Sequence, residues 1–161
     1  MRREEARIIV IYYMAIPDML QGFRQQKADI EDTYYNGVRG INMDGMPHGT
    51  NPGRPTESMG VLAADNGAGK RLREIETRIG VLERDRELIR DSIDGLNGRY
   101  KKLLILRYQH EYSWTKISFR MKASDSTVRY WHDKALDRLA YAMEDVPMVN
   151  EILLRASRAR K

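Results

Sequence analysis

The sequence predicts an all-α protein, with an N-terminal helical hairpin or coiled coil followed by a C-terminal helix-turn-helix module. Three observations support this prediction. Apolar residues recur at helical spacing between residues 20 and 34, and a heptad repeat of Leu and Ile spans residues 72–96. Two short helical patterns, each preceded by a serine cap, follow between residues 113 and 139. We divide the chain into segments 1–36, 37–69, 70–97, 98–143 and 144–161.

Segment 1–36 is predicted to hold the N-terminal helices. Residues three and four apart lie on one face of a helix, and the stripe formed in this way consists of Leu20, Phe23, Lys27, Ile30 and Tyr34. Pro17 would kink a continuous helix or open a second one as its first residue. We expect the helix to stop at Gly37, because glycine commonly follows the last turn of a helix.

Segment 37–69 changes in composition. It is dense in Gly, Pro, Asn, Thr and Ser, for example in "NGVRGINMDGMPHGTNPGRPTESMG", and it has no sustained apolar period. Such composition predicts a loop or linker. A loop of this length is uncommon in a compact domain unless it is functional or mobile.

Segment 70–97 is predicted to be a heptad helix. Its apolar seam, which would form a hairpin or an oligomer, consists of Leu72, Ile75, Ile79, Leu82, Ile89, Ile93 and Leu96. This helix can fold back on the N-terminal stripe, pair with its copy in a dimeric coiled coil, or combine the two. Arg86 at a seam position and Gly80 in mid-helix both weaken a long regular coiled coil.

Segment 98–143 is predicted to be a helix-turn-helix. Ser113 and Ser124 are suited to cap the second and third helices, and "KAS" supplies the short turn between them. The leading helix offers the packing residues Leu103, Leu104, Leu106 and Tyr108. The short second helix buries Trp114, Ile117 and Met121, and the third helix buries Val128, Trp131, Ala135 and Leu139.

The open face of the third helix is predicted to contact DNA, because the N-terminal residues of this helix reach base edges in a helix-turn-helix. The predicted base contacts are Asp125, Ser126, Arg129, Tyr130 and Lys134. The predicted phosphate contacts are Ser124, Thr127, Lys116, Arg120 and Lys122. Charge agrees with this assignment: ten basic and four acidic residues give segment 98–143 a net charge of +6, whereas the whole chain carries +5.

The stretch "LLILRYQHEYSWTKISFRMKASDSTVRYWHDKALDRL", residues 103–139, resembles region 4 of bacterial sigma-70 factors, which recognises the −35 promoter element. The whole layout, including "MPHGTNPGRPTESMG", is similar to phage-encoded late transcription regulators of the ArpU and RinA type. This resemblance implies host RNA polymerase as a partner. Sigma-like turns usually carry Gly where Lys122 stands, so we expect a different turn or a strain of roughly 1 kcal/mol at this residue.

Segment 144–161 is predicted to restart a helix near Pro147. Its modest apolar stripe consists of Met148, Ile152, Leu153 and Ala156. The basic end, "RASRARK", is expected to be a frayed and solvated tail, with phosphate contact as the alternative.

Catalytic and cofactor sites find little support in the sequence. The chain has no cysteine, and His48, His110 and His132 lie in different segments without ligand-spaced neighbours, so we expect no metal site. "NGAGK" resembles the end of a nucleotide-binding P-loop, but Ala64 and Arg71 stand where that motif needs Gly and Ser or Thr. We therefore expect no bound cofactor and no enzymatic activity.

A cytoplasmic location in a bacterial host is expected. The longest apolar run, Ile8–Ile16, is shorter than the roughly 20 residues that a membrane-spanning helix needs. Glu4 and Glu5 in the leader argue against a signal peptide.

These patterns together predict a sequence-specific regulator of phage transcription that binds double-stranded DNA as a homo-oligomer, with a dimer favoured. Two alternatives stay open. The first is a small terminase subunit that binds DNA for genome packaging. The second is an interaction protein that imitates sigma region 4 and binds polymerase without DNA.

Overall fold

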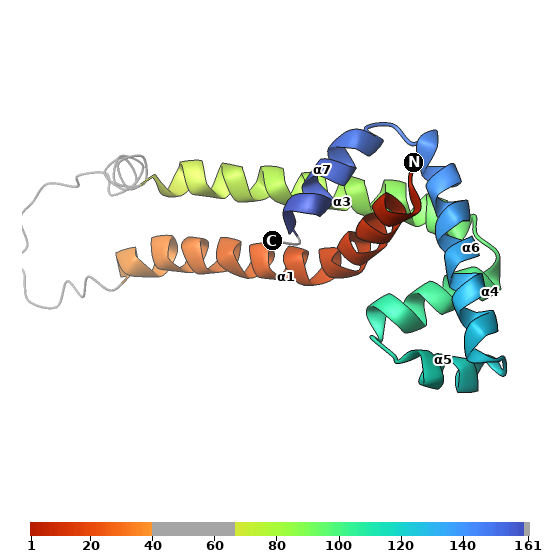
Figure 1. Ribbon diagram of the computed structural model, residues 1–161. Helices are drawn as coiled ribbons and strands as arrows, with labels where there is room; N and C mark the ends of the chain where they lie inside the picture. Colours follow the sequence, from red (N-terminus) through yellow and green to blue (C-terminus); the bar gives the residue numbers. More distant parts are fainter. Residues whose placement is uncertain (40–66, 160–161) are drawn as a thin grey trace, which may run out of the picture. The chain divides into compact units, whose positions relative to one another are not determined.

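The computed structural model describes residues 1–39 and 67–159, and the side chains of residues 34–39 lie outside that description. Within these ranges every regular element is helical, which confirms the predicted all-α class (Figure 1). The elements are α1 (Arg3–Arg39), α3 (Ala68–Asp94), α4 (Gly98–Leu104), the π-helical turn η1 (Ile105–Gln109), α5 (Trp114–Met121), α6 (Asp125–Glu144) and α7 (Val149–Ala159).

The first helix is longer than predicted. α1 continues through Pro17, so this residue does not open a second helix. The predicted stop at Gly37 is wrong, because α1 runs to Arg39. A glycine inside a helix costs only about 1 kcal/mol relative to alanine, which the rest of the helix can offset. The predicted loop 37–69 is shortened at both ends, and its residues 40–66 lie outside the described part of the chain.

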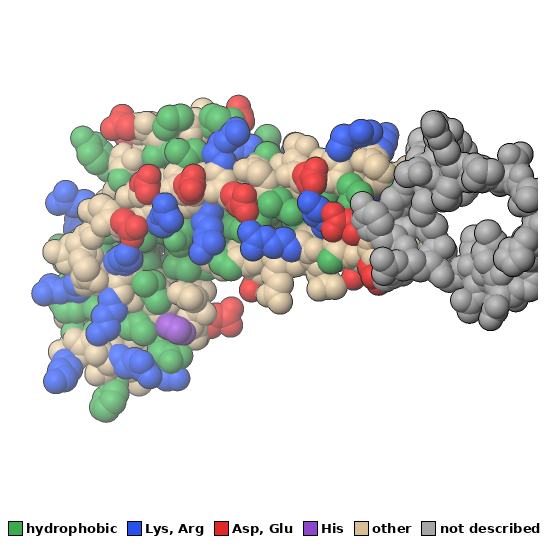
Figure 2. Space-filling model, turned by 180° about the vertical axis from the view of Figure 1, so that it is seen from behind, with side chains coloured by type: hydrophobic (Ala, Val, Ile, Leu, Met, Phe, Trp, Pro, Cys, Tyr) green, Lys and Arg blue, Asp and Glu red, His purple; other side chains and the backbone are tan. Residues whose placement is uncertain are grey.

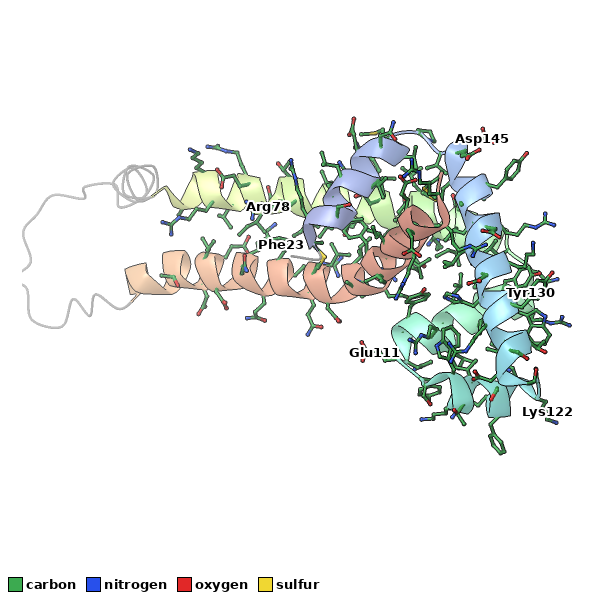
Figure 3. All side chains as sticks on the ribbon, in the orientation of Figure 1. Phe23, Arg78, Glu111, Lys122, Tyr130 and Asp145 are labelled. Atoms are coloured by element: carbon green, nitrogen blue, oxygen red, sulfur yellow. The ribbon has the colours of Figure 1, made fainter. Side chains whose placement is uncertain are left out.

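The chain forms two compact units, of which the smaller spans Asp18–Val81. In this unit the second part of α1 pairs with the first part of α3. Lys27 Nζ lies 2.6 Å from Glu76 Oε1, and the Arg78 guanidinium lies 5.7 Å from the centre of the Phe23 ring (Figure 3). The later residue of α1 meets the earlier residue of α3, so the two segments run antiparallel. The heptad helix thus packs on the N-terminal helix of its own chain, as a hairpin.

The larger unit combines Met1–Pro17 with Leu82–Lys161. Its fully buried apolar side chains come from the start of α1, the end of α3, and the helices α4 to α7. The largest of them are Ile9, Ile16, Ile89, Leu103, Leu104, Ile117, Leu136, Leu139, Met143 and Ile152. Each such side chain contributes roughly 1.5–3 kcal/mol by its removal from water. The helix-turn-helix therefore shares one folded unit with the start of α1 and the end of α3.

A buried carboxylate lies among these side chains. Asp85, only 1% exposed, accepts a hydrogen bond of 2.9 Å from the Tyr12 hydroxyl. It also accepts bonds of 2.8 and 2.7 Å from Nε and Nη2 of Arg155. Burial, and then the bond to Asp85, raise the pKa of Tyr12 above its ordinary value. Arg86, which the heptad places at the seam, is exposed instead. Asp85, three positions after Leu82, lies on the buried face in its place, and the seam position is buried again at Ile93.

The last helix is more ordered than expected for a frayed tail. α7 extends to Ala159, with Ile152 and Ala156 buried and Met148 exposed at its start. Arg155, the first residue of "RASRARK", is the partner of Asp85 rather than a solvated tail residue. Burial of an apolar helix face and a bidentate ion pair together explain why this end is folded.

Candidate nucleic-acid interface

The candidate interface is built on a small core formed by α4, η1, α5 and α6. Leu103, Leu106, Ile117 and Val128 form its buried centre. Five half-buried side chains pack around this centre: Tyr112, Trp114, Met121, Ala123 and Trp131. α4 and α5 both contact α6, which Figure 1 shows as the long helix of this part. Trp114, Met121 and Trp131 were predicted to be buried, but each is only partly covered. The Arg99 guanidinium lies 4.5 Å from the centre of the Trp131 ring.

Two serine caps define where α5 and α6 begin, as the sequence predicts. Ser113 Oγ accepts a hydrogen bond from the Lys116 amide at 3.3 Å, and Ser124 Oγ accepts one from the Thr127 amide at 3.2 Å. Each cap satisfies an amide that has no partner within its own helix. Between the end of α5 and the start of α6 lie only Lys122, Ala123 and Ser124. This arrangement of a short helix, a tight turn and a longer capped helix is that of a helix-turn-helix.

The turn requires a left-handed backbone at Lys122. This residue has φ 51° and ψ 47°, and its amide bonds to the carbonyl groups of Phe119 and Ser118 at the end of α5. Glycine adopts this conformation without steric cost, whereas lysine does so with strain of roughly 1 kcal/mol, as the sequence leads us to expect. The Lys122 side chain is exposed at the end of the module (Figure 3).

Arg129 is the cation on α6 whose position best suits contact with a base edge. Its Nε donates a 2.8 Å hydrogen bond to Asp125 Oδ2 one turn earlier, and its guanidinium lies 5.0 Å from the centre of the Trp114 ring. The side chain is still 56% exposed. The bond to Asp125 uses Nε, so the two terminal amino groups remain as the fork that matches O6 and N7 of a guanine. Asp125, predicted to contact a base itself, is instead engaged with Arg129.

Trp114 is a supporting residue that the sequence analysis assigned only to packing. The centre of its ring lies 4.5 Å from the Arg107 guanidinium, 5.0 Å from the Arg129 guanidinium and 5.0 Å from the centre of the His132 ring, which is nearly perpendicular to it. A guanidinium over an indole face is attracted by the negative charge of that face. Trp114 and Arg129 are 15 positions apart on different helices, so helical periodicity gives no signal for this pair.

The hydroxyl groups at the start of α6 form a connected cluster. Ser124 Oγ lies 3.0 Å from Ser126 Oγ and 2.7 Å from Thr127 Oγ1. Ser124 therefore already serves as a cap and as the centre of this cluster. A phosphate at this helix start would meet backbone N–H groups, the positive end of the helix dipole and these hydroxyls together.

Two of the residues predicted to contact phosphates have their charged groups over the ring of Tyr112. Lys116 Nζ is 3.7 Å, and the Arg120 guanidinium 5.0 Å, from the centre of the Tyr112 ring. Both cations are exposed. Tyr112, which the sequence analysis did not single out, thus holds two positive charges one turn apart on the outer surface of α5.

The remaining predicted base contacts continue along α6. Tyr130 is 59% exposed, and Lys134 Nζ lies 5.7 Å from the centre of its ring. Seen from the opposite side, the module carries several Lys and Arg side chains at its outer edge and few acidic ones (Figure 2). The predicted contacts therefore fall into four groups: the capped start of α6, the exposed face of α6, the outer surface of α5, and Lys122 in the turn between the two helices.

His132 is enclosed rather than free. Its Nε2 lies 2.8 Å from the Tyr108 hydroxyl, and its Nδ1 lies 3.3 Å from Asp133 Oδ1. A proton on Nδ1 satisfies both contacts, because Nδ1–H then donates to Asp133 while Nε2 accepts from Tyr108. Burial lowers the pKa of His132 below its ordinary value, although the hydrogen bond to Asp133 opposes this shift.

Neither a metal cluster nor a membrane span is found in the described ranges. No group of three or more His, Cys, Asp or Glu side chains in residues 1–33 and 67–159 could hold a metal ion. His48 lies outside these ranges. Likewise, none of the described helices has the length and apolar character needed to cross a bilayer.

Comparisons of the chain with known protein families, with curated proteins and with solved structures return no match.

Proposed function

We propose that this protein is a sequence-specific regulator of phage transcription that binds duplex DNA through α5 and α6. One observation carries the proposal. Arg129 is exposed at the start of a capped helix and is held from two sides, by the Asp125 carboxylate and by the Trp114 ring. A guanidinium with restricted motion and a free terminal fork loses little entropy when it binds the edge of a guanine.

The proposed complex places the first turns of α6 in the major groove, which is wide enough to admit an α-helix. Arg129 contacts a guanine, and Ser126 and Tyr130 lie beside it on the same face of α6. The capped start of α6 and the cations Lys116, Arg120 and Lys122 then meet phosphates on either side of the groove. Arg129 supplies sequence preference in this arrangement, and the other cations supply affinity that depends on salt.

The resemblance to sigma region 4 extends the proposal to host RNA polymerase as a partner in a bacterial cytoplasm. Binding of purified polymerase to the full-length chain, with and without duplex DNA, tests this part. Polymerase binding that needs no DNA, in a chain that binds no DNA, would instead support a protein that imitates region 4.

A homo-oligomer, with a dimer favoured, belongs to the same proposal. One helix-turn-helix contacts only a few base pairs, and two modules on one scaffold bind a paired site far better. Ile75, Leu82, Ile89 and Ile93 are buried within a single chain, so a dimer needs other surface. Light scattering tests the dimer directly. A stable monomer at concentrations well above those of DNA binding would remove it, and a large ring-shaped assembly would favour a small terminase subunit.

Selection of bound sequences from random duplex DNA is the main test. We expect a defined site that contains a guanine. Arg129→Ala should lose roughly 1–3 kcal/mol of binding free energy on that site. Arg138→Ala is the matched control, since it removes the same charge from an exposed position later on α6. On random DNA the two variants should bind alike.

Two results would contradict the proposal. Equal losses for Arg129→Ala on selected and random DNA would make Arg129 a phosphate contact. Binding that depends on DNA length alone, with no preferred sequence, would favour packaging or a simple charge attraction.

A further inference from the structure

Two carboxylates on α6 lie beside the face proposed to meet DNA. Asp133 and Asp137 are one turn apart, and their side chains are 50% and 40% exposed. They follow Arg129 by one and two turns along the helix. Carboxylates near a phosphate backbone repel it, so their presence on this helix requires an explanation.

Arg3, from the first turn of α1, binds both of them. Its Nε and Nη2 donate to the two oxygens of Asp137 at 2.8 and 3.0 Å, and its Nη1 lies 3.2 Å from Asp133 Oδ2. The hydrogen bond to Asp137 raises the pKa of Arg3, and the same bond lowers the pKa of Asp137. One guanidinium thus bridges two carboxylates in a bidentate arrangement, which differs from an isolated surface ion pair of little energy.

A basic residue directly follows each of these carboxylates in the sequence. Lys134 follows Asp133 directly, and Arg138 follows Asp137. Without Arg3, each carboxylate could rotate toward the DNA or toward the neighbouring cation. Either movement would reduce the positive potential that this face presents to phosphates.

We infer that Arg3 is a positioning residue for DNA binding, which holds the carboxylates of Asp133 and Asp137 away from the DNA-facing surface of α6. This inference rests on the proposed function. It assigns to the first turn of α1 a role in affinity although Arg3 itself contacts no DNA. Arg3 then couples the first turn of α1 to the DNA-binding helix, because a displacement of this turn uncovers two negative charges on α6.

The test measures fluorescence anisotropy of a labelled random-sequence duplex of about 30 base pairs, three helical turns, as the full-length chain is added. Arg3→Gln should weaken binding roughly three- to tenfold at low salt, as expected for two unmasked surface charges. Arg2→Gln is the matched control, since it removes the same charge from the adjacent exposed residue. It should produce a smaller loss.

The decisive comparison repeats both variants in a chain that carries Asp133→Asn and Asp137→Asn. The excess loss of Arg3→Gln over Arg2→Gln should disappear there, because no carboxylate remains to be held. An excess that persists in the Asn background would mean that Arg3 contacts DNA itself, and this would overturn the inference. Equal losses for the two variants in the wild-type background would overturn it as well.

Two controls separate other failures. Thermal melting identifies any variant that loses its fold. A folded Arg3→Lys keeps the charge but cannot make the bidentate contact, so its affinity should lie between those of the wild type and Arg3→Gln. Binding lost in Arg3→Lys as fully as in Arg3→Gln, with both variants folded, contradicts charge masking. A wild-type chain that binds no duplex at all contradicts the proposed function instead.

Discussion

Replacement of Arg155 by methionine should destabilise the larger unit strongly. Arg155 donates hydrogen bonds from Nε and Nη2 to the two oxygens of Asp85, whose side chain is 1% exposed. Without Arg155, the carboxylate keeps the hydrogen bond from Tyr12 but loses its countercharge. Removal of one partner of a buried ion pair costs about 3–5 kcal/mol, because the other charge remains buried. Methionine retains much of the apolar stem, so the loss reports mainly on the charge.

Urea unfolding of the full-length chain, followed by circular dichroism, measures this loss. Arg158→Met is the matched control, since Arg158 lies in the same helix and is exposed. Its effect should stay within about 0.5 kcal/mol. Asp85→Asn in the Arg155→Met background should recover part of the stability, because an amide is far less costly to bury than a carboxylate. An Arg155→Met chain as stable as the control would refute the reasoning that this ion pair holds α7 in place.

Two further predictions concern the module. Lys122→Gly should stabilise the chain by roughly 1 kcal/mol, because glycine adopts φ 51° without strain, and should weaken DNA binding if Lys122 contacts a phosphate. Lys122→Ala removes the same charge but keeps the Cβ atom that causes the strain. If its urea midpoint rises as much as that of Lys122→Gly, the strain argument is wrong. The lowered pKa of His132 means that the folded state binds its proton less readily than the unfolded chain, so stability should fall as the pH drops below about 6.5. Unfolding measured between pH 7 and 5 should show a flatter profile for His132→Gln, and a profile as steep as that of the wild type would contradict this role of His132.

The local features of this protein could be predicted from the sequence. The helical class, the caps at Ser113 and Ser124, and the left-handed residue at Lys122 all depend on contacts between residues fewer than about six positions apart. Helical spacing also predicts which faces of these helices turn inward, because a helix with one apolar stripe can bury only that stripe. It does not predict that Trp114, Met121 and Trp131 are only half-buried. The DNA contacts predicted on α5, on α6 and in the turn between them stay a prediction.

The pairing of these helices was decided only by the tertiary structure. The heptad stripe of α3 is compatible with a second copy as well as with α1, since apolar burial is not directional. Charged partners are equally hidden from sequence patterns. Asp85 and Arg155 are 70 positions apart, and Arg3 and Asp137 are 134 apart. In each pair, the packing of the helices brings the two opposite charges within hydrogen-bond distance. The sequence pattern does not show which charges will meet, because this depends on how the helices pack.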